Sequence, residues 1–134
     1  MTNVDLYMTI DSTTGLIYKV ITRKYSKEDA MTACADLEMR LLVVNSVDKL
    51  NLLDRVKSSS LILEQGSLRL SGGWYEVDGV TKWWDGGDPP QPLSDKLMKW
   101  DTAVEFEHGS CLVYNNKNVR RTSCTPQLFS ICEI

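Results

Sequence analysis

The first forty residues alternate between apolar and polar positions in a pattern that predicts a hairpin followed by a helix. Residues 5–10 alternate weakly, turn-forming residues follow at 11–15, and residues 16–21 again have a strand pattern. Beyond this hairpin, Ser26 precedes small and apolar residues at helical spacing. We therefore predict a helix over residues 26–38 that faces inward through Ala30, Ala33, Cys34 and Leu37.

A second strand and a second helix are predicted in the next twenty residues. Residues 40–44 form a short apolar strand in this interpretation. Ser46 can cap the following helix, which the serines at 58–60 would end. The residues expected to face the core from this helix are Val47, Leu50, Leu53 and Val56.

The pattern changes from Gly66 onward, where glycine, proline, aspartate and tryptophan replace the helical period. Trp83, Trp84 and Trp100 flank a loop over residues 85–99 that holds three of the four prolines. Loops of this length inside compact domains usually serve a function. Three short strands are predicted after the loop, over residues 111–114, 119–124 and 129–132.

Composition limits the class of protein. With 134 residues and a hydrophobic fraction of 43%, the chain can form one domain with a core, and we treat residues 1–134 as that domain. The longest aliphatic run, residues 41–44, is much shorter than the roughly 20 residues of a membrane helix. The net charge of -3 argues against a nucleic-acid partner, because proteins that bind nucleic acids normally have a basic face.

Four cysteines, Cys34, Cys111, Cys124 and Cys132, are the main chemical signal in the sequence. None lies in a Cys-x-x-Cys pair, and the lone His108 leaves no set of ligands with zinc spacing. An even number of cysteines indicates two disulfides and an oxidising compartment, although four free thiols in a cytosolic protein are the alternative. Spacing alone leaves all three pairings open.

Several groups of residues follow one another along the chain: the helix start at 25–30 with Cys34, the run at 41–46, Trp-Trp-Asp-Gly at 83–86, Cys111, Cys124, and the ending Phe129-Ser130-Ile131-Cys132-Glu133. Taken in this order, they resemble the C-type lectin-like domain family over residues 16–134. Residues 68–71, Leu-Arg-Leu-Ser, depart from the Trp-Ile-Gly-Leu that the family usually has there.

The resemblance implies an α+β, C-type lectin-like fold in which two helices pack on small antiparallel sheets beside a long loop region. It implies two disulfides, one between Cys34 and Cys132 and one between Cys111 and Cys124. It also implies that residues 1–21 are an N-terminal hairpin extension of the domain. The expected location is extracellular, either secreted or as the ectodomain of a membrane-anchored parent protein.

Calcium-dependent members of the family bind the ion and a sugar through a Glu-Pro-Asn or Gln-Pro-Asp loop and a Trp-Asn-Asp strand. The positions that match this strand motif hold Val119, Arg120 and Arg121, and the two arginines would repel a divalent cation. We therefore expect neither a metal site nor a cofactor. A different calcium site could still be built from the acidic residues of the loop region, Asp88, Asp95, Asp101, Glu105 and Glu107.

The missing calcium ligands and the Cys-Glu-Ile ending resemble natural-killer-receptor-type domains and, equally, secreted invertebrate lectin-like proteins. The resemblance implies calcium-independent recognition of a protein ligand, and no catalytic motif indicates an enzyme. The alternative is a lectin that uses a non-standard calcium site or an anionic-glycan patch. A third hypothesis is that the domain is a structural or oligomerising module, which could form a homodimer.

Four residues are the candidates for contacting a ligand. Trp84 follows Trp83, so we expect it on the opposite strand face, exposed, while Trp83 and Trp100 belong to the core. The remaining candidates are cations close together on one predicted hairpin, where they could face an acidic protein or a sulfated glycan. They are Lys117, Arg120 and Arg121.

Overall fold

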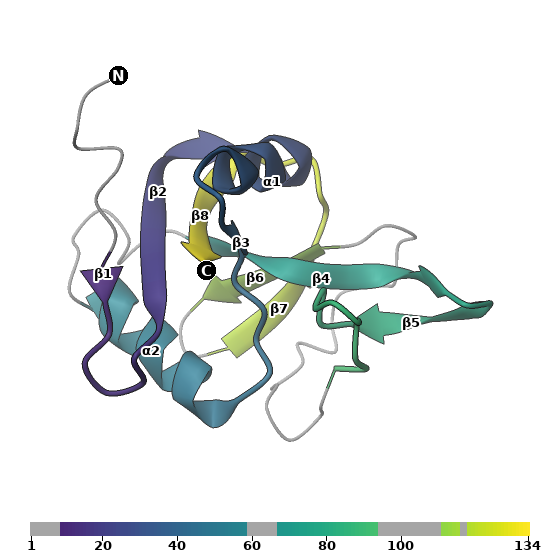
Figure 1. Ribbon diagram of the computed structural model, residues 1–134. Helices are drawn as coiled ribbons and strands as arrows, with labels where there is room; N and C mark the ends of the chain where they lie inside the picture. The colour runs from purple at the N-terminus through teal and green to yellow at the C-terminus, as the bar shows by residue number, and fades with distance from the viewer. Residues whose placement is uncertain (1–8, 59–66, 94–110, 116–117) are drawn as a thin grey trace.

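The computed structural model describes residues 9–58, 67–93, 111–115 and 118–134, and within these ranges it forms an α+β fold (Figure 1). The elements are β1 (Thr9–Ile10), β2 (Ile17–Tyr25), α1 (Lys27–Asp36), β3 (Arg40–Leu41), α2 (Val47–Ser58), β4 (Leu68–Val77), β5 (Val80–Trp84), β6 (Cys111–Asn115), β7 (Asn118–Thr122) and β8 (Leu128–Glu133).

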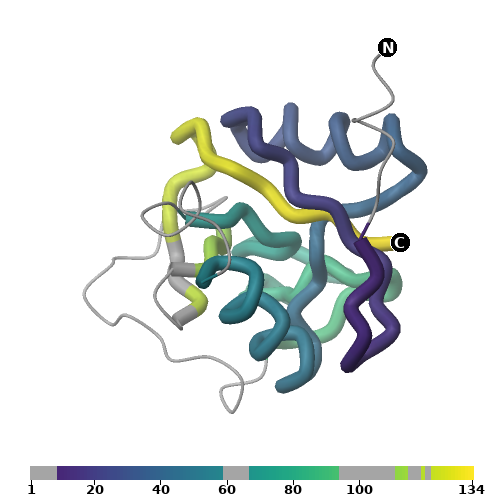
Figure 2. The backbone as a smooth tube through the Cα atoms, turned by 90° about the vertical axis from the view of Figure 1, so that its left-hand side faces the viewer, coloured from purple at the N-terminus to yellow at the C-terminus, as the bar shows by residue number. Residues whose placement is uncertain are grey.

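One mixed sheet links the two ends of the chain. Its order among the described strands is β1-β2-β8-β4-β6-β7, with β3 also paired to β8 and β5 to β4. β8 lies antiparallel to β2 and parallel to β4, so the last strand joins the first part of the chain to its second half. Figure 2, turned by 90° from the view of Figure 1, shows β2 and β8 running side by side.

The helix predicted over residues 26–38 is confirmed as α1. Ser26 is its N-cap, and the Ser26 hydroxyl accepts a hydrogen bond from the Asp29 amide. The buried residues of the helix are the small Ala30 and Cys34, which allow it to approach the sheet closely. Cys34 is joined to Cys132 in β8, with the two Cα atoms 5.6 Å apart.

The second helix is also confirmed, but its inward face differs from the prediction, because Leu52, which was not predicted to face inward, is buried and Val47 is not. Leu52, Leu53 and Val56 are buried in the main core, whereas Val47 is 58% exposed. At 100° per residue, Val47 lies opposite Val56 on the helix surface, so both cannot face the core. The expectation that Val47 faces inward is therefore wrong.

The strand predicted over residues 40–44 is shorter than expected. β3 ends at Leu41, and the chain then continues through the buried residues 42–44 without strand pairing. Backbone groups there find other partners: the Leu42 amide donates to the Ile131 carbonyl, and the Val43 amide donates to the Glu133 carboxylate at 2.6 Å. The Glu133 side chain therefore supplies a hydrogen-bond acceptor to a buried amide that has no partner strand.

Both flanking hairpins agree with the sequence. β1 pairs with β2 across the predicted turn, and Asp11 in that turn forms an ion pair with Arg55 of α2 at 2.9 Å. β6 pairs with β7, and the disulfide between Cys111 and Cys124 closes this hairpin, with Cα atoms 5.1 Å apart. The predicted disulfide pairing is thus the one observed.

The sequence analysis did not predict the long hairpin of β4 and β5, which projects from the body of the molecule (Figure 1). Its strand β4 contains Gly72 and Gly73, which weaken any strand pattern. Gly72 has φ +94°, and a Cβ there would collide with the Trp84 carbonyl. These glycines allow β4 to shift register between Arg69 and Gly73 as it passes from β6 to β5.

Candidate functional site

Trp84 does not lie where a ligand could stack on an exposed ring. Only 8% of the residue is exposed, and its indole Nε1 donates to the Tyr75 carbonyl at 2.8 Å. The reason lies in the strand register: Trp84 is paired with Gly73, which has no side chain, so there is room for the indole to fold over the hairpin. The expectation of an exposed Trp84 is wrong, whereas Trp83 lies in the core as predicted.

The predicted cationic patch falls largely outside the described part of the structure. Lys117 lies outside the described residues, as do Trp100, Asp95, Asp101, Glu105 and Glu107. Arg120 and Arg121 are placed by their backbone in β7, opposite Val113 and Leu112, but their side chains are not described. The anion-binding role of these arginines therefore stays a prediction.

The described start of the long loop is held by Asp85. This residue is buried, and its Oδ1 accepts hydrogen bonds from the amides of Gly87 and Gln91 at 2.8 and 2.9 Å. The loop consequently turns back so that Asp88 and Gln91 are exposed. Within the described residues, no three histidine, cysteine, aspartate or glutamate side chains gather in a group that could hold a metal ion.

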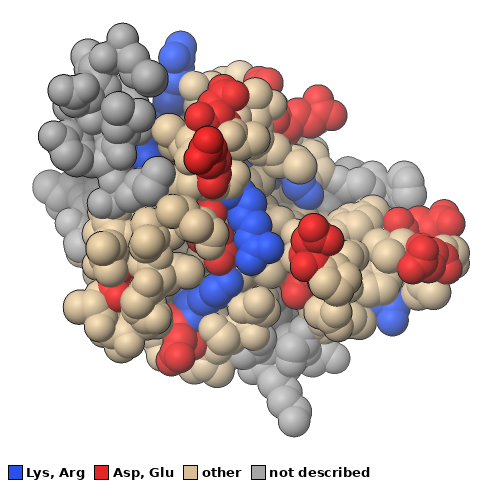
Figure 3. Space-filling view, in the orientation of Figure 1, with Lys and Arg blue, Asp and Glu red and all other residues tan. Residues whose placement is uncertain are grey.

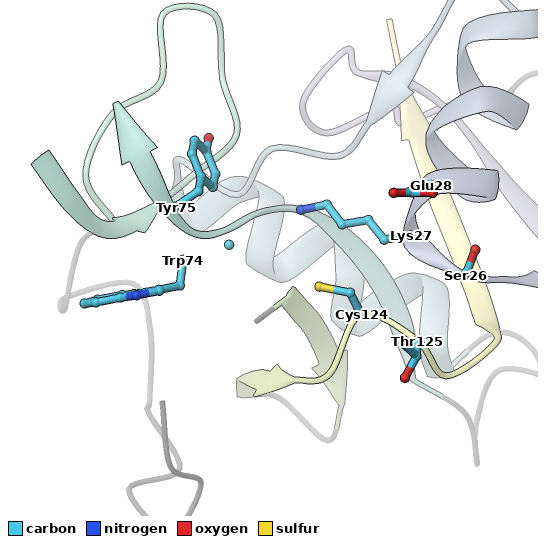
Figure 4. Close-up of a pocket in the computed structure, with 8 residues that line it drawn as sticks. Ser26, Lys27, Glu28, Trp74, Tyr75, Cys124 and Thr125 are labelled. Atoms are coloured by element: carbon cyan, nitrogen blue, oxygen red, sulfur yellow. The ribbon is translucent and has the colours of Figure 1, made fainter. Parts of the chain in front are cut away.

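Another part of the described surface carries a groove. It has a volume of about 530 Å³ and lies between the start of α1, the middle of β4 and the segment after β7 (Figure 4). Lys27 extends from α1 toward β4, and the rings of Trp74 and Tyr75 leave that strand in different directions. Its lining residues are Ser26, Lys27, Glu28, Gly73, Trp74, Tyr75, Cys124 and Thr125.

The cation in this groove is held by a backbone carbonyl. The Lys27 Nζ donates to the Gly72 carbonyl at 2.6 Å, at the point where β4 shifts register. Burial, and to a lesser extent the nearby charge of Arg69, lowers the pKa of Lys27 from 10.5 to about 8. Among the described residues, no carboxylate forms an ion pair with Lys27.

Arg69 is a second cation behind the same groove. It is fully buried, and burial lowers its pKa. Its guanidinium donates to the carbonyls of Ser123 and Pro126, the latter at 2.6 Å, while its Nε has no hydrogen-bond partner among the described residues. Arg69 thereby fixes the segment that carries Cys124 and Thr125 against β4.

The two aromatic residues of the groove rest on a rigid base. Trp74 packs against Trp83 with ring centroids 5.9 Å apart, and Tyr75 lies 6.5 Å from Trp84. Both remain partly exposed. Sequence reasoning missed this site, although the Gly-Gly-Trp-Tyr run of residues 72–75 was a usable signal, since adjacent glycines before two aromatic residues indicate a bulge beside a contact surface.

Comparison with known proteins identifies the fold. No family model matches the sequence, and no curated protein matches it. Solved structures do match: a Ca2+-dependent type II antifreeze protein in its Ca2+-free form aligns with a TM-score of 0.69 and 19% identity, over 95% of this chain and 96% of that one. The chain has a C-type lectin-like fold.

Two further solved structures share this fold. The C-type lectin domain of murine dendritic cell inhibitory receptor 2, in complex with an N-glycan, aligns with a TM-score of 0.64 and 14% identity, over 89% of this chain and 90% of that one. SPL-1 in complex with GlcNAc aligns with a TM-score of 0.69 and 17% identity, over 89% and 87% of the two chains. At these identities the likeness concerns the fold.

Proposed function

We propose that this C-type lectin-like domain is a non-catalytic extracellular recognition module that binds a protein ligand through the groove of Lys27, Trp74 and Tyr75, without calcium. The observation that carries the proposal is the aromatic pair at a preformed groove. Tryptophan and tyrosine dominate the energetics of protein interfaces, especially beside pockets that exclude water. Here both residues lie on a strand fixed by the packing of Trp74 on Trp83.

Other observations support the extracellular and non-catalytic parts of the proposal. Two disulfides are typical of proteins in oxidising compartments. The solved structures of similar fold are named as lectin or antifreeze proteins. The arginines at 120 and 121, which stand at the family's calcium positions, favour a calcium-independent contact.

A binding screen tests the proposal directly. The intact domain is screened against a panel of purified extracellular proteins by interferometry, once in calcium and once in chelator. We expect a partner whose affinity is equal in both buffers and falls at least about tenfold in the Trp74→Leu variant, which keeps apolar packing on Trp83. The matched control is Ile10→Ala, an exposed residue in β1. Binding that is unaffected by Trp74→Leu would contradict the proposal.

Glycan binding is the second candidate function. It is favoured by the two neighbours of similar fold that were solved with an N-glycan and with GlcNAc. The glycan could be held by a non-standard calcium site in the acidic loop or by the patch of Lys117, Arg120 and Arg121. A glycan array read in calcium and in chelator separates these two sites. Signals that the Arg120→Ala/Arg121→Ala variant loses would favour the patch.

A further inference from the structure

Two cations lie at the groove without an acidic partner in the described structure. Lys27 contributes its ammonium to the groove wall, and Arg69 stands behind it, fully buried. Both form their described hydrogen bonds to backbone carbonyls, and neither forms an ion pair with a described carboxylate. An ammonium carries three donor hydrogens, and within the described part of the chain Lys27 donates one of them, to the Gly72 carbonyl, so the group can donate to a further partner.

The cost of this arrangement favours an anionic ligand. A partly desolvated ammonium loses hydration without a carboxylate to compensate it. The second charge, on Arg69, increases the penalty, and the lowered pKa of Lys27 is in keeping with this. A carboxylate bound in the groove would compensate the charge of Lys27, which lines it, and would lower the repulsion that Lys27 experiences from Arg69.

The surroundings of the groove limit what else the ligand can be. Glu28 lies at the rim, exposed, and Glu76 and Asp78 lie in the projecting β4–β5 hairpin. Figure 3 shows acidic side chains at the end of the molecule where Figure 1 places that hairpin. A polyanion such as a sulfated glycan would be repelled by these carboxylates, whereas a single carboxylate could pass between them.

From this charge pattern and the aromatic rims, we infer that the groove binds a peptide segment of the protein ligand that places one aspartate or glutamate side chain on Lys27 and an apolar side chain against Trp74 and Tyr75. This inference rests on the proposed function and specifies the chemistry of the partner. The carboxylate would accept hydrogen bonds from the two remaining N–H groups of the ammonium. None of the four residues that the sequence predicts as ligand contacts, Trp84, Lys117, Arg120 and Arg121, is among the residues that line this groove.

The test is a selection from a random twelve-residue peptide display library against the intact domain. We expect peptides enriched in aspartate or glutamate next to an apolar residue, with affinities that fall at least tenfold in Lys27→Met. The same peptides should keep their affinity for Lys24→Met, a control that removes an exposed lysine of β2. Replacing the acidic residue of the best peptide by its amide should cost as much as Lys27→Met, and little in the Lys27→Met background.

The outcomes separate this inference from the proposed function. Selected peptides that lack acidic residues, but lose binding in Trp74→Leu, would overturn the acidic specificity and leave the groove as the protein-binding site. Peptides that bind equally well to Lys27→Met would overturn the inference as well. A selection that yields no peptide would also overturn the inference, whereas the proposed function is decided separately by the screen against extracellular proteins.

Discussion

Lys49 and Lys27 are both largely buried, but among the residues that the structure describes only Lys49 forms an ion pair with a carboxylate. The Lys49 Nζ lies 2.9 Å from the carboxylate of Glu133 and 2.9 Å from the Val43 carbonyl. Glu133 is itself 2% exposed and also accepts the Val43 amide. Lys27 has a carbonyl and a neighbouring arginine, but no described carboxylate. The ion pair of Lys49 with Glu133 stabilises the fold, whereas the charge of Lys27 is available for a ligand.

The comparison also explains why the two regions differ in shape. Glu133 connects β8 to the unpaired segment of residues 42–44, so its polar groups substitute for a missing ladder. Lys27 instead lies where β4 shifts register at Gly72, and the bulge turns a carbonyl toward a groove. Proteins often retain such uncompensated groups at binding sites, where they cost stability and gain function.

The largest expected change in the free energy of unfolding comes from removing the carboxylate of Glu133, which forms an ion pair with Lys49. Glu133→Gln keeps an acceptor for the Val43 amide but leaves Lys49 without a carboxylate, so we expect the free energy of unfolding to fall by about 3 kcal/mol. Chemical denaturation measures the change. The double variant Lys49→Met/Glu133→Gln should regain much of the loss, and a loss that is simply additive would contradict the pairing.

The next effect has the opposite sign. Lys27→Met removes a cation whose burial is uncompensated, so we expect the free energy of unfolding to rise by about 2 kcal/mol at neutral pH, after subtraction of the lost hydrogen bond.

The pH dependence of that gain follows from the lowered pKa of Lys27. The folded protein releases the Lys27 proton near pH 8, while the unfolded chain holds it up to about 10.5. The unfolded state therefore binds more protons between these values, and the wild-type protein gains stability as pH rises through this window. The advantage of Lys27→Met should shrink over the same range. Denaturation curves at about pH 7 and about pH 10 measure it, and an advantage that stays constant would argue against a buried charge.

The smallest effect serves as the reference for both lysines. Lys24 is exposed, with its ammonium 5.4 Å from the ring of Phe129, and Lys24→Met should change the free energy of unfolding by less than about 0.5 kcal/mol. A larger change would mean that loss of any lysine alters this acidic protein, and the contrast between Lys49 and Lys27 would lose its basis.

Local patterns in the sequence predicted most of the framework. The helix starting after Ser26, the second helix, both flanking hairpins and the last strand depend on short-range periodicity, turns and caps. The disulfide pairing came from the resemblance to the C-type lectin-like family, since the spacing of four cysteines allows three pairings.

The candidate site could not be predicted in the same way, because it depends on contacts between distant residues. Lys27 and Gly72 are 45 positions apart, and only the register shift of β4 brings the carbonyl to the ammonium. The burial of Trp84 depends on which residue is opposite it, and the sequence does not show that this is Gly73. Alternation along the strand predicts that Trp84 and Trp83 point to opposite faces, but it does not show which residues pack over Trp84.

The most direct test of the central claim is a lysine titration by NMR, with 13C labels at the ε carbons of the free domain. The lysine ε-carbon signal that disappears in the Lys27→Met variant is assigned to Lys27. Our account predicts that Lys27 titrates near pH 8 in the free protein and that its pKa rises when an acidic peptide selected by the wild-type domain is added. Titration at or above 10.5 in the free protein would show that the charge is already compensated, and would contradict the account.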